Sequence, residues 1–227
     1  MKNKIKLNDP KHIFIIAEAG SNWKAGSYKK DIERAEKLIK VAAKSGADAI
    51  KFQTYNPKSV YVPNAGKSKY LLKSGMDKSI FEIFQKYSMP HKMLKDLSII
   101  CKKEKILFMS TPFSVEDAKV VNKFVKIHKI AAFEINHIRL LEYLASTKKP
   151  IIISTGASDS SEIDYAVKLL KKKGAKKICL LQTTSKYPAP IETLNLKVIA
   201  ELKKKYNVPV GLSDHSIEPI LGPTLAI

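Results

Sequence analysis

Short apolar segments alternate with amphipathic segments along most of the chain. Between the apolar segments, hydrophobic residues recur at helical spacing, as in Ile32, Ala35, Ile39 and Ala43. A regular strand–helix alternation of this kind predicts a parallel sheet with helices packed outside it. The seven predicted strands cover residues 13–17, 47–52, 106–109, 127–132, 150–153, 178–181 and 208–212.

Local residue chemistry predicts where several of the helices begin and end. Gly46 follows the first helix and suits the left-handed position that ends one. Ser114 is expected to cap the helix after the third strand, with Asp117 as the acid of a capping box, and Ser160 or Ser161 to cap a later one. The predicted helices cover residues 32–43, 79–86, 90–101, 115–124, 140–145, 160–170, 194–205 and 217–227.

The pattern favours a TIM (β/α)8-type barrel over a doubly wound open sheet. Polar residues follow nearly every predicted strand, and barrel enzymes build their active sites at that end of the strands. The sequence has no glycine-rich nucleotide-binding motif. We expect residues 1–227 to form one barrel domain with about seven β/α units. An unclosed barrel leaves strand edges unpaired. We therefore expect an eighth unit beyond Ile227 in a longer protein, or a partner subunit that covers the gap.

Charge and composition narrow the class of protein. Hydrophobic residues make up 44% of the chain, enough for a sizeable core. The net charge of +20 comes almost entirely from lysines spread along helix faces, because Arg34 and Arg139 are the two arginines. Base recognition favours arginine, and no basic segment is rich in aromatic residues. A nucleic-acid-binding protein is therefore the weaker alternative, although the charge would attract small anionic substrates.

The chain carries no pattern typical of secretion or membrane insertion. Residues 1–10 lack the continuous apolar segment of a signal peptide, and no apolar segment approaches the roughly 20 residues that span a bilayer. Cys101 and Cys179 lie among apolar residues, as buried reduced thiols do. These features predict a cytoplasmic protein.

The polar residues after the strands suggest a chemistry. Lys51 and Lys129, surrounded by hydroxyl groups, would suit a phosphate. Glu18 and Glu134 would bind a sugar or move protons, and His215 would hold a divalent metal. Taken alone, His215 or Lys51 is more often a structural or solvated residue than a site residue, but the recurrence at successive strand ends favours a shared site.

Several segments resemble the sialic acid synthase family, and they occur in the family's order along nearly the whole chain. The family makes nonulosonic acids from phosphoenolpyruvate and an N-acetylated hexose. The matching segments are IAEAGSN (16–22), GADAIKFQT (46–54), STPF (110–113), KIA (129–131), FEIN (133–136), STG (154–156), YPAP (187–190) and GLSDH (211–215).

The resemblance implies roles for individual residues. Gln53 and Tyr187 are similar to sugar contacts, Glu18 and Glu134 to catalytic or substrate-orienting acids, and His215 to a metal ligand. The residues that resemble the phosphoenolpyruvate-binding set are Lys51, Thr111, Lys129, Ser154, Ser185 and Ser213. We also expect Lys129 to be catalytic. The implied metal is Mn²⁺, with Mg²⁺ or Co²⁺ as alternatives, and the implied full-length assembly is a homodimer.

The implied reaction is an aldol-like condensation. Carbon 3 of phosphoenolpyruvate attacks the sugar aldehyde, which the metal polarises; water then adds at carbon 2, and the intermediate loses phosphate. Family members continue into an eighth strand with a second metal histidine and then into an antifreeze-like domain. We therefore expect the 227-residue chain alone to lack efficient turnover.

The sequence departs from the family pattern at three places, and the sugar stays open. Ala132 replaces a serine of many members, Trp23 a histidine, and Ser185 an asparagine of some. An N-acetylmannosamine-type substrate is the first prediction, and pseudaminic, legionaminic or spore-coat sugar synthesis is the alternative. An inactive barrel fragment is a further alternative.

Overall fold

Seven parallel strands alternate with helices in the computed structural model, which describes residues 7, 9, 11–68, 72 and 75–227. The strands are β1 (Ile16–Gly20), β2 (Ala49–Thr54), β3 (Leu107–Pro112), β4 (His128–Ile130), β5 (Ile151–Ser154), β6 (Ile178–Thr183) and β7 (Val210–Ser213). The helices are α1 (Tyr28–Lys44), α2 (Pro57–Val60), α4 (Ile80–Tyr87), α5 (His91–Lys103), α6 (Val115–Val121), α7 (Ile138–Ser146), α8 (Ser160–Lys172), α9 (Lys197–Tyr206) and α10 (Leu221–Leu225), with 3₁₀ turns η1 (Ala132–Glu134) and η2 (Ile191–Thr193). This is the α/β architecture with parallel strands that the sequence predicts.

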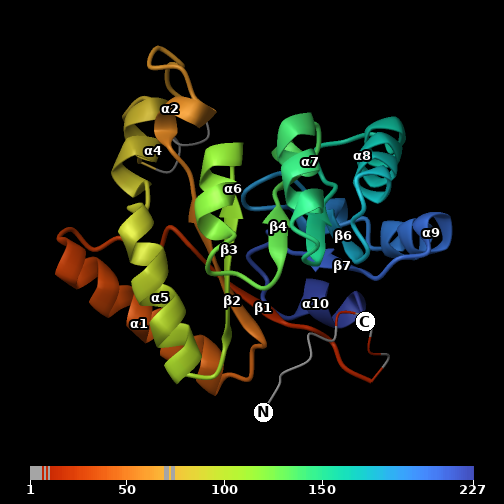
Figure 1. The fold of residues 1–227 in the computed structure, drawn as a ribbon, viewed down its shortest axis with the longest axis horizontal. Helices are drawn as coiled ribbons and strands as arrows, with labels where there is room; N and C mark the ends of the chain where they lie inside the picture. The colour runs from red at the N-terminus through yellow and green to blue at the C-terminus, as the bar shows by residue number, and fades with distance from the viewer. Residues whose placement is uncertain (1–6, 8, 10, 69–71, 73–74) are drawn as a thin grey trace. The chain divides into compact units, whose positions relative to one another are not determined.

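The first compact unit, residues 15–126, contains a three-stranded sheet in the order β1-β2-β3. One face of this sheet packs on α1 and α5 (Figure 1). Phe52 and Phe108 point from neighbouring strands into this layer, with ring centroids 6.0 Å apart, and Ile39 and Leu94 meet them from the helices. Because side chains alternate along a strand, the residues between these apolar ones point to the opposite face.

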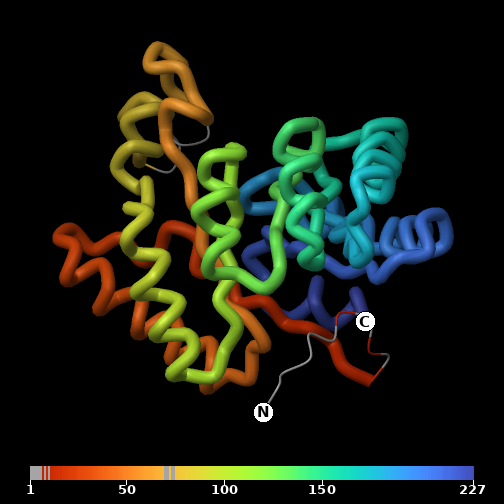
Figure 2. Tube along the Cα trace, viewed as in Figure 1, coloured from red at the N-terminus to blue at the C-terminus, as the bar shows by residue number. Residues whose placement is uncertain are grey.

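The connection between β2 and α4 is the orange loop at the top of Figure 2. Tyr55 begins it and packs its ring against Phe84 and Phe113, at centroid distances of 5.0 and 5.6 Å. This connection contains the short helix α2 and is anchored by aromatic contacts at its start. Part of it, like most of residues 1–10, lies outside the described residues.

The second compact unit, residues 1–14 and 127–227, contains a four-stranded sheet in the order β4-β5-β6-β7. Its central strands are apolar and buried, as expected for a parallel sheet with both faces covered. The helices α7 and α8 each present a buried apolar stripe that includes Leu141, Leu144, Ile163 and Leu170. No helix in the described part of the chain is long and apolar enough to cross a membrane.

Most predicted elements are confirmed, and two cap assignments are wrong. Asp159, rather than Ser160 or Ser161, caps α8, and its carboxylate accepts two backbone N–H groups. Ser114 does cap α6, but Asp117 accepts a hydrogen bond from the Ser114 hydroxyl rather than completing a capping box. Several strands continue past the C-terminal end of their apolar segment. The hydrogen bonds between strands join backbone groups and therefore do not depend on whether the side chains are apolar.

Candidate active site

Four of the predicted site residues share one face of the first sheet. Glu18 is the register partner of Lys51, and Gln53 that of Thr111. Lys51 and Gln53 are two positions apart on β2, so both point away from the face that packs on α1 and α5. The sheet therefore presents an ammonium group, a carboxylate, an amide and a hydroxyl side by side.

Lys51 and Glu18 form an ion pair across β1 and β2. The lysine side chain is largely buried, whereas that of the glutamate is about half exposed, so the glutamate keeps access to solvent or a ligand. The Thr111 side chain is buried, and its hydroxyl has no hydrogen-bond partner among the described residues. A buried hydroxyl without a partner is able to bond a ligand oxygen.

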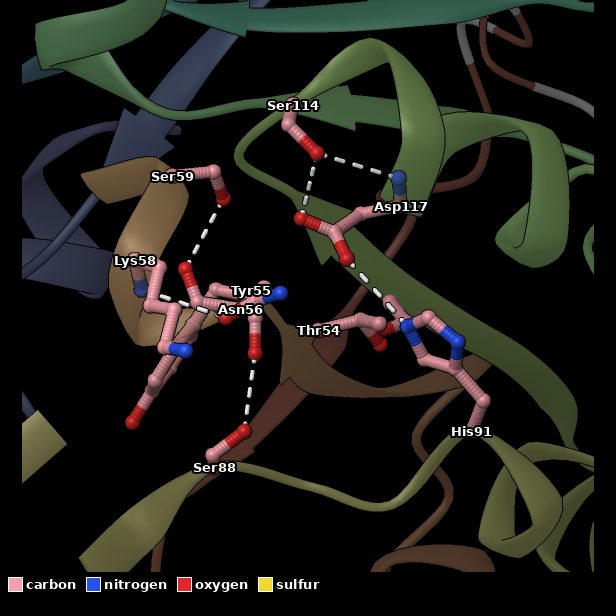
Figure 3. A network of polar contacts seen from close by, with 10 residues as sticks. Thr54, Tyr55, Asn56, Lys58, Ser59, Ser88, His91, Ser114 and Asp117 are labelled. Carbon is pink, nitrogen blue, oxygen red and sulfur yellow. Dashed lines mark hydrogen bonds and ion pairs between the residues drawn. The ribbon is translucent and has the colours of Figure 1, made fainter. Parts of the chain in front are cut away.

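A polar network holds the loops that follow β2 and β3 (Figure 3). The Ser88 hydroxyl donates to the Tyr55 carbonyl at 2.9 Å, at the point where the chain leaves β2. On the other loop, the buried carboxylate of Asp117 joins the Ser114 hydroxyl, at 2.6 Å, to Nε2 of His91, at 3.2 Å. The contacts of Asp117 thus tie the first residue of α5 to the start of α6, which follows β3 along the chain.

In the second unit, Lys129 and Ser154 lie together on neighbouring strands. The Lys129 side chain is almost fully buried, and its Nζ donates to the Ser154 hydroxyl at 2.7 Å and to the Ile130 carbonyl at 2.8 Å. A buried ammonium group is costly unless it is hydrogen-bonded. Ser213 of β7 faces Thr183 in the register, on the same face of the sheet as Lys129 and Ser154.

Glu134 ends the 3₁₀ turn that follows β4. Burial raises the pKa of its carboxyl to about 7, although the charge of Lys129 acts in the opposite direction. Its Oε2 is buried and makes no hydrogen bond with any described residue. A carboxyl with a pKa near neutrality can both give and take a proton at physiological pH. Glu134 therefore has the properties of a general acid or base.

Tyr187 and His215 stack on each other, with ring centroids 4.1 Å apart. Nδ1 of His215 lies 2.8 Å from the Thr184 carbonyl, which can only accept, so Nδ1 carries the proton. Nε2 is then the acceptor nitrogen, 3.2 Å from the Tyr187 hydroxyl. The Ser185 hydroxyl, in the same segment, is buried without a partner among the described residues.

His215 fits a metal as one ligand, because a backbone carbonyl fixes its tautomer, as is usual for metal-binding histidines. However, no group of three His, Cys, Asp or Glu side chains in the described part of the chain is placed to hold an ion. The described residues therefore do not make a complete metal site.

The predicted site residues thus form pairs and groups within each unit. The structure brings Glu18, Lys51, Gln53 and Thr111 together in the first unit. In the second unit it joins Lys129 with Ser154, and Tyr187 with His215. Sequence reasoning missed the supporting contacts of His91 with Asp117 and of the Thr184 carbonyl with His215. Nothing in the pattern of residues marks them, because both depend on how separate segments fold together.

Comparisons with known proteins identify the family. Residues 38–227 match the model of the NeuB family. The chain belongs to the NeuB family. Its relatives in this family include the pseudaminic acid synthase of Campylobacter jejuni, 39% identical over 224 residues, which are 97% of this chain and 63% of that protein. The N,N'-diacetyllegionaminic acid synthase of the same species is 40% identical over 91% of this chain and 61% of that protein.

A solved structure also agrees with the fold. The structure of an N-acetylneuraminic acid (sialic acid) synthetase from Leptospira borgpetersenii superposes with a TM-score of 0.79 at 36% identity, over 94% of this chain and 68% of that chain. The resemblance to the sialic acid synthase family is therefore confirmed. The present chain spans less than two thirds of the length of the two Campylobacter relatives.

Proposed function

We propose that this chain carries the phosphoenolpyruvate site of a nonulosonic acid synthase, which condenses phosphoenolpyruvate with an N-acetylated hexose of the N-acetylmannosamine type. The single observation that supports it best is Lys129, a buried ammonium group hydrogen-bonded to the Ser154 hydroxyl in a member of the NeuB family. A buried cation beside hydroxyl donors suits a ligand that carries a phosphate and a carboxylate.

The proposed anion-binding set combines charge with hydroxyl donors. Lysine supplies a point charge. The hydroxyls of Thr111 and Ser185, which are buried without a partner among the described residues, supply donors. Phosphoenolpyruvate would be bound by Lys51, Thr111, Lys129, Ser154, Ser185 and Ser213. Gln53 and Tyr187 would contact the sugar.

In the proposed reaction, carbon 3 of phosphoenolpyruvate forms a bond to the aldehyde carbon of the open-chain sugar, and the aldehyde oxygen takes a proton. Glu134 would give that proton, because burial raises the pKa of its carboxyl to about 7. Water then adds at carbon 2, and phosphate leaves to give the 2-oxo acid. Glu18, paired with Lys51, orients the substrate.

We further propose that His215 supplies one ligand to a divalent metal, Mn²⁺ or alternatively Mg²⁺ or Co²⁺. Such a metal would act as a Lewis acid on the sugar aldehyde when it is bound. The described residues supply no complete set of metal ligands. The roles proposed for Glu134 and Glu18 therefore rest on their own side chains. The cytoplasm as the location and a homodimer as the full-length assembly remain proposals.

The experiment that tests the function measures phosphoenolpyruvate binding by calorimetry and phosphate release with a panel of N-acetylated hexoses, with and without Mn²⁺. Lys51→Ala should abolish binding. Lys40→Ala is the matched control, because Lys40 pairs with Glu36 on the exposed face of α1. Unchanged binding in Lys51→Ala would remove the proposed anion site. The panel also identifies the sugar and so separates the sialic, pseudaminic, legionaminic and spore-coat alternatives.

A nucleic-acid-binding role predicts tight, salt-dependent binding to DNA or RNA instead of binding to phosphoenolpyruvate. Binding that depends on phosphate contacts weakens steeply with salt. Titration of the chain with duplex and single-stranded nucleic acid at two salt concentrations therefore separates the two classes. We expect weak binding without sequence preference, as a lysine-rich surface gives.

A further inference from the structure

A cavity lies in the first unit, away from the proposed site residues of that unit. It has a volume of about 450 Å³ and lies between the C-terminal end of α5, the start of β3 and residues 123–126. In Figure 1 this is the end of α5 from which the chain turns into β3. Thr111 of the proposed site lies at the opposite end of β3, whose six residues span roughly 20 Å at about 3.3 Å per residue.

The floor of this cavity is apolar. Ile106, Phe108 and Cys101 are buried there, and Phe124 is partly buried beside them. Burial raises the pKa of the Cys101 thiol to about 12, so the thiol is neutral at physiological pH. The floor therefore offers aromatic and aliphatic contacts without a negative charge.

The rim of the cavity is cationic. Lys102, Lys123 and Lys126 line it, and no lining residue is Asp or Glu. These three lysines form no ion pair with any described residue. Lys102 has a structural role as well, since it lies in the last turn of α5, where a positive charge favours the helix dipole. Lys123 and Lys126 lie after α6, outside its last turn.

We propose that this cavity binds a small organic anion that carries an apolar ring, with the ring on the apolar floor and the anionic group among the lysines. The volume falls in the range of small-molecule sites, roughly 300 to 1,000 Å³. Charge complementarity selects the anion, because three cations surround an opening without acidic residues. An anion lacking an apolar part would gain little here, since the exposed lysines alone bind weakly. The site goes beyond the proposed synthase reaction and does not depend on it.

The test uses 1-anilinonaphthalene-8-sulfonate, an aromatic anion, and N-phenyl-1-naphthylamine, its neutral counterpart. We expect the anion to bind saturably, at about one per chain, and more tightly than the neutral probe at low salt. Lys123→Gln with Lys126→Gln should weaken anion binding about tenfold, through two exposed charge contacts. Ser98→Phe, which fills the cavity from α5, should reduce the binding of both probes.

A matched control removes the same charge elsewhere. Lys29 and Lys30 are exposed in the first turn of α1, so the double change to Gln there should leave probe binding as in the parent chain. Near-UV circular dichroism checks that every variant is folded. The proposal would be overturned if the double change at Lys123 and Lys126 left anion binding equal to that of the double change at Lys29 and Lys30. Unchanged probe binding in Ser98→Phe would also overturn it. Equal affinity for both probes would overturn its anionic part.

Discussion

The phenol ring of Tyr187 stacks on the imidazole ring of His215 at an interplanar angle of 28°, while its hydroxyl lies 3.2 Å from Nε2. Nδ1 keeps its proton and donates it in a hydrogen bond to the Thr184 carbonyl, so Nε2 has the lone pair that a metal ion would need. The Tyr187 hydroxyl therefore donates to the nitrogen through which His215 would bind a metal.

This relationship predicts opposite effects for two substitutions. His215→Ala should weaken Mn²⁺ binding about tenfold or more, because it removes a ligand. Tyr187→Phe keeps the stacked ring but removes the competing donor, so Mn²⁺ should bind as tightly as before or more tightly. Electron paramagnetic resonance of free Mn²⁺ measures both. His12→Ala, at an exposed position, is the control. Equal Mn²⁺ affinity in His215→Ala and the parent chain would contradict the assignment.

The carboxyl of Glu134 gives a pH-dependent prediction. Its pKa is about 7 in the folded chain and about 4.5 without burial. The unfolded state therefore releases the proton at lower pH, and this group's contribution to stability is present below pH 4.5 and lost as the pH rises through 7. Glu134→Gln should leave the midpoint of thermal unfolding nearly unchanged at pH 4.5. At pH 8.5 it should stabilise the chain by up to about 3 kcal/mol.

The comparison with a surface carboxylate isolates the effect of burial. Glu142 on α7 is exposed and pairs with Lys173. Glu142→Gln therefore removes a carboxylate charge from the surface, whereas Glu134→Gln removes a buried one. Thermal unfolding at several pH values, recorded for both variants and the parent, gives the two differences. A Glu134→Gln difference that does not grow with pH would show that the carboxyl is not buried as the structure describes.

The pair formed by Lys129 and Ser154 separates stability from ligand binding. Ser154→Ala removes one of the hydrogen-bond acceptors of the buried Lys129 Nζ. We expect this loss to lower the free energy of unfolding by about 1 to 3 kcal/mol. Lys129→Met keeps an apolar stem and removes the charge, so it should keep the fold but abolish phosphoenolpyruvate binding. Urea unfolding and calorimetry measure the two effects. Ser160→Ala, at an exposed position that does not cap α8, should change neither by more than about 0.5 kcal/mol.

The order of strands and helices could be predicted from the sequence because apolar periodicity depends on local burial. Gly46, with φ of +83°, follows the end of α1 as predicted, and Pro90 directly precedes α5. The cap of α8 could not be chosen, because Asp159, Ser160 and Ser161 are all residues that cap helices. Only the path of the backbone decides which side chain reaches the free N–H groups.

The candidate site was predictable as a set of residue types at strand ends, but not as a set of contacts. Which residues share a face depends on the register, which places Gln53 beside Thr111. The sequence alone also suggests that a lysine is exposed, whereas Lys129 is buried by its strand neighbours. The pairing of Lys51 with Glu18 depends on the same register.

Gly156 directly follows Thr155 at the end of β5, where the backbone of β6 passes very close. A Cβ atom at this position would lie 2.1 Å from the Thr183 carbonyl oxygen and 2.7 Å from its carbon. Both are backbone atoms, so no change of rotamer can relieve the clash. Gly156→Ala should therefore separate the ends of β5 and β6 and destabilise the chain by at least about 2 kcal/mol.

Gly211 on β7 provides the matched comparison for Gly156. Its added Cβ would lie 3.2 Å from Cδ2 of Leu181, the end of a flexible side chain that can move by a few tenths of an ångström. Gly211→Ala should therefore cost less than about 1 kcal/mol. Urea unfolding of both variants measures the difference, and phosphoenolpyruvate binding should fall in Gly156→Ala because Ser154 is displaced with the strand end. Equal stability of the two variants would mean that the strands are not as close at Gly156 as the structure has them.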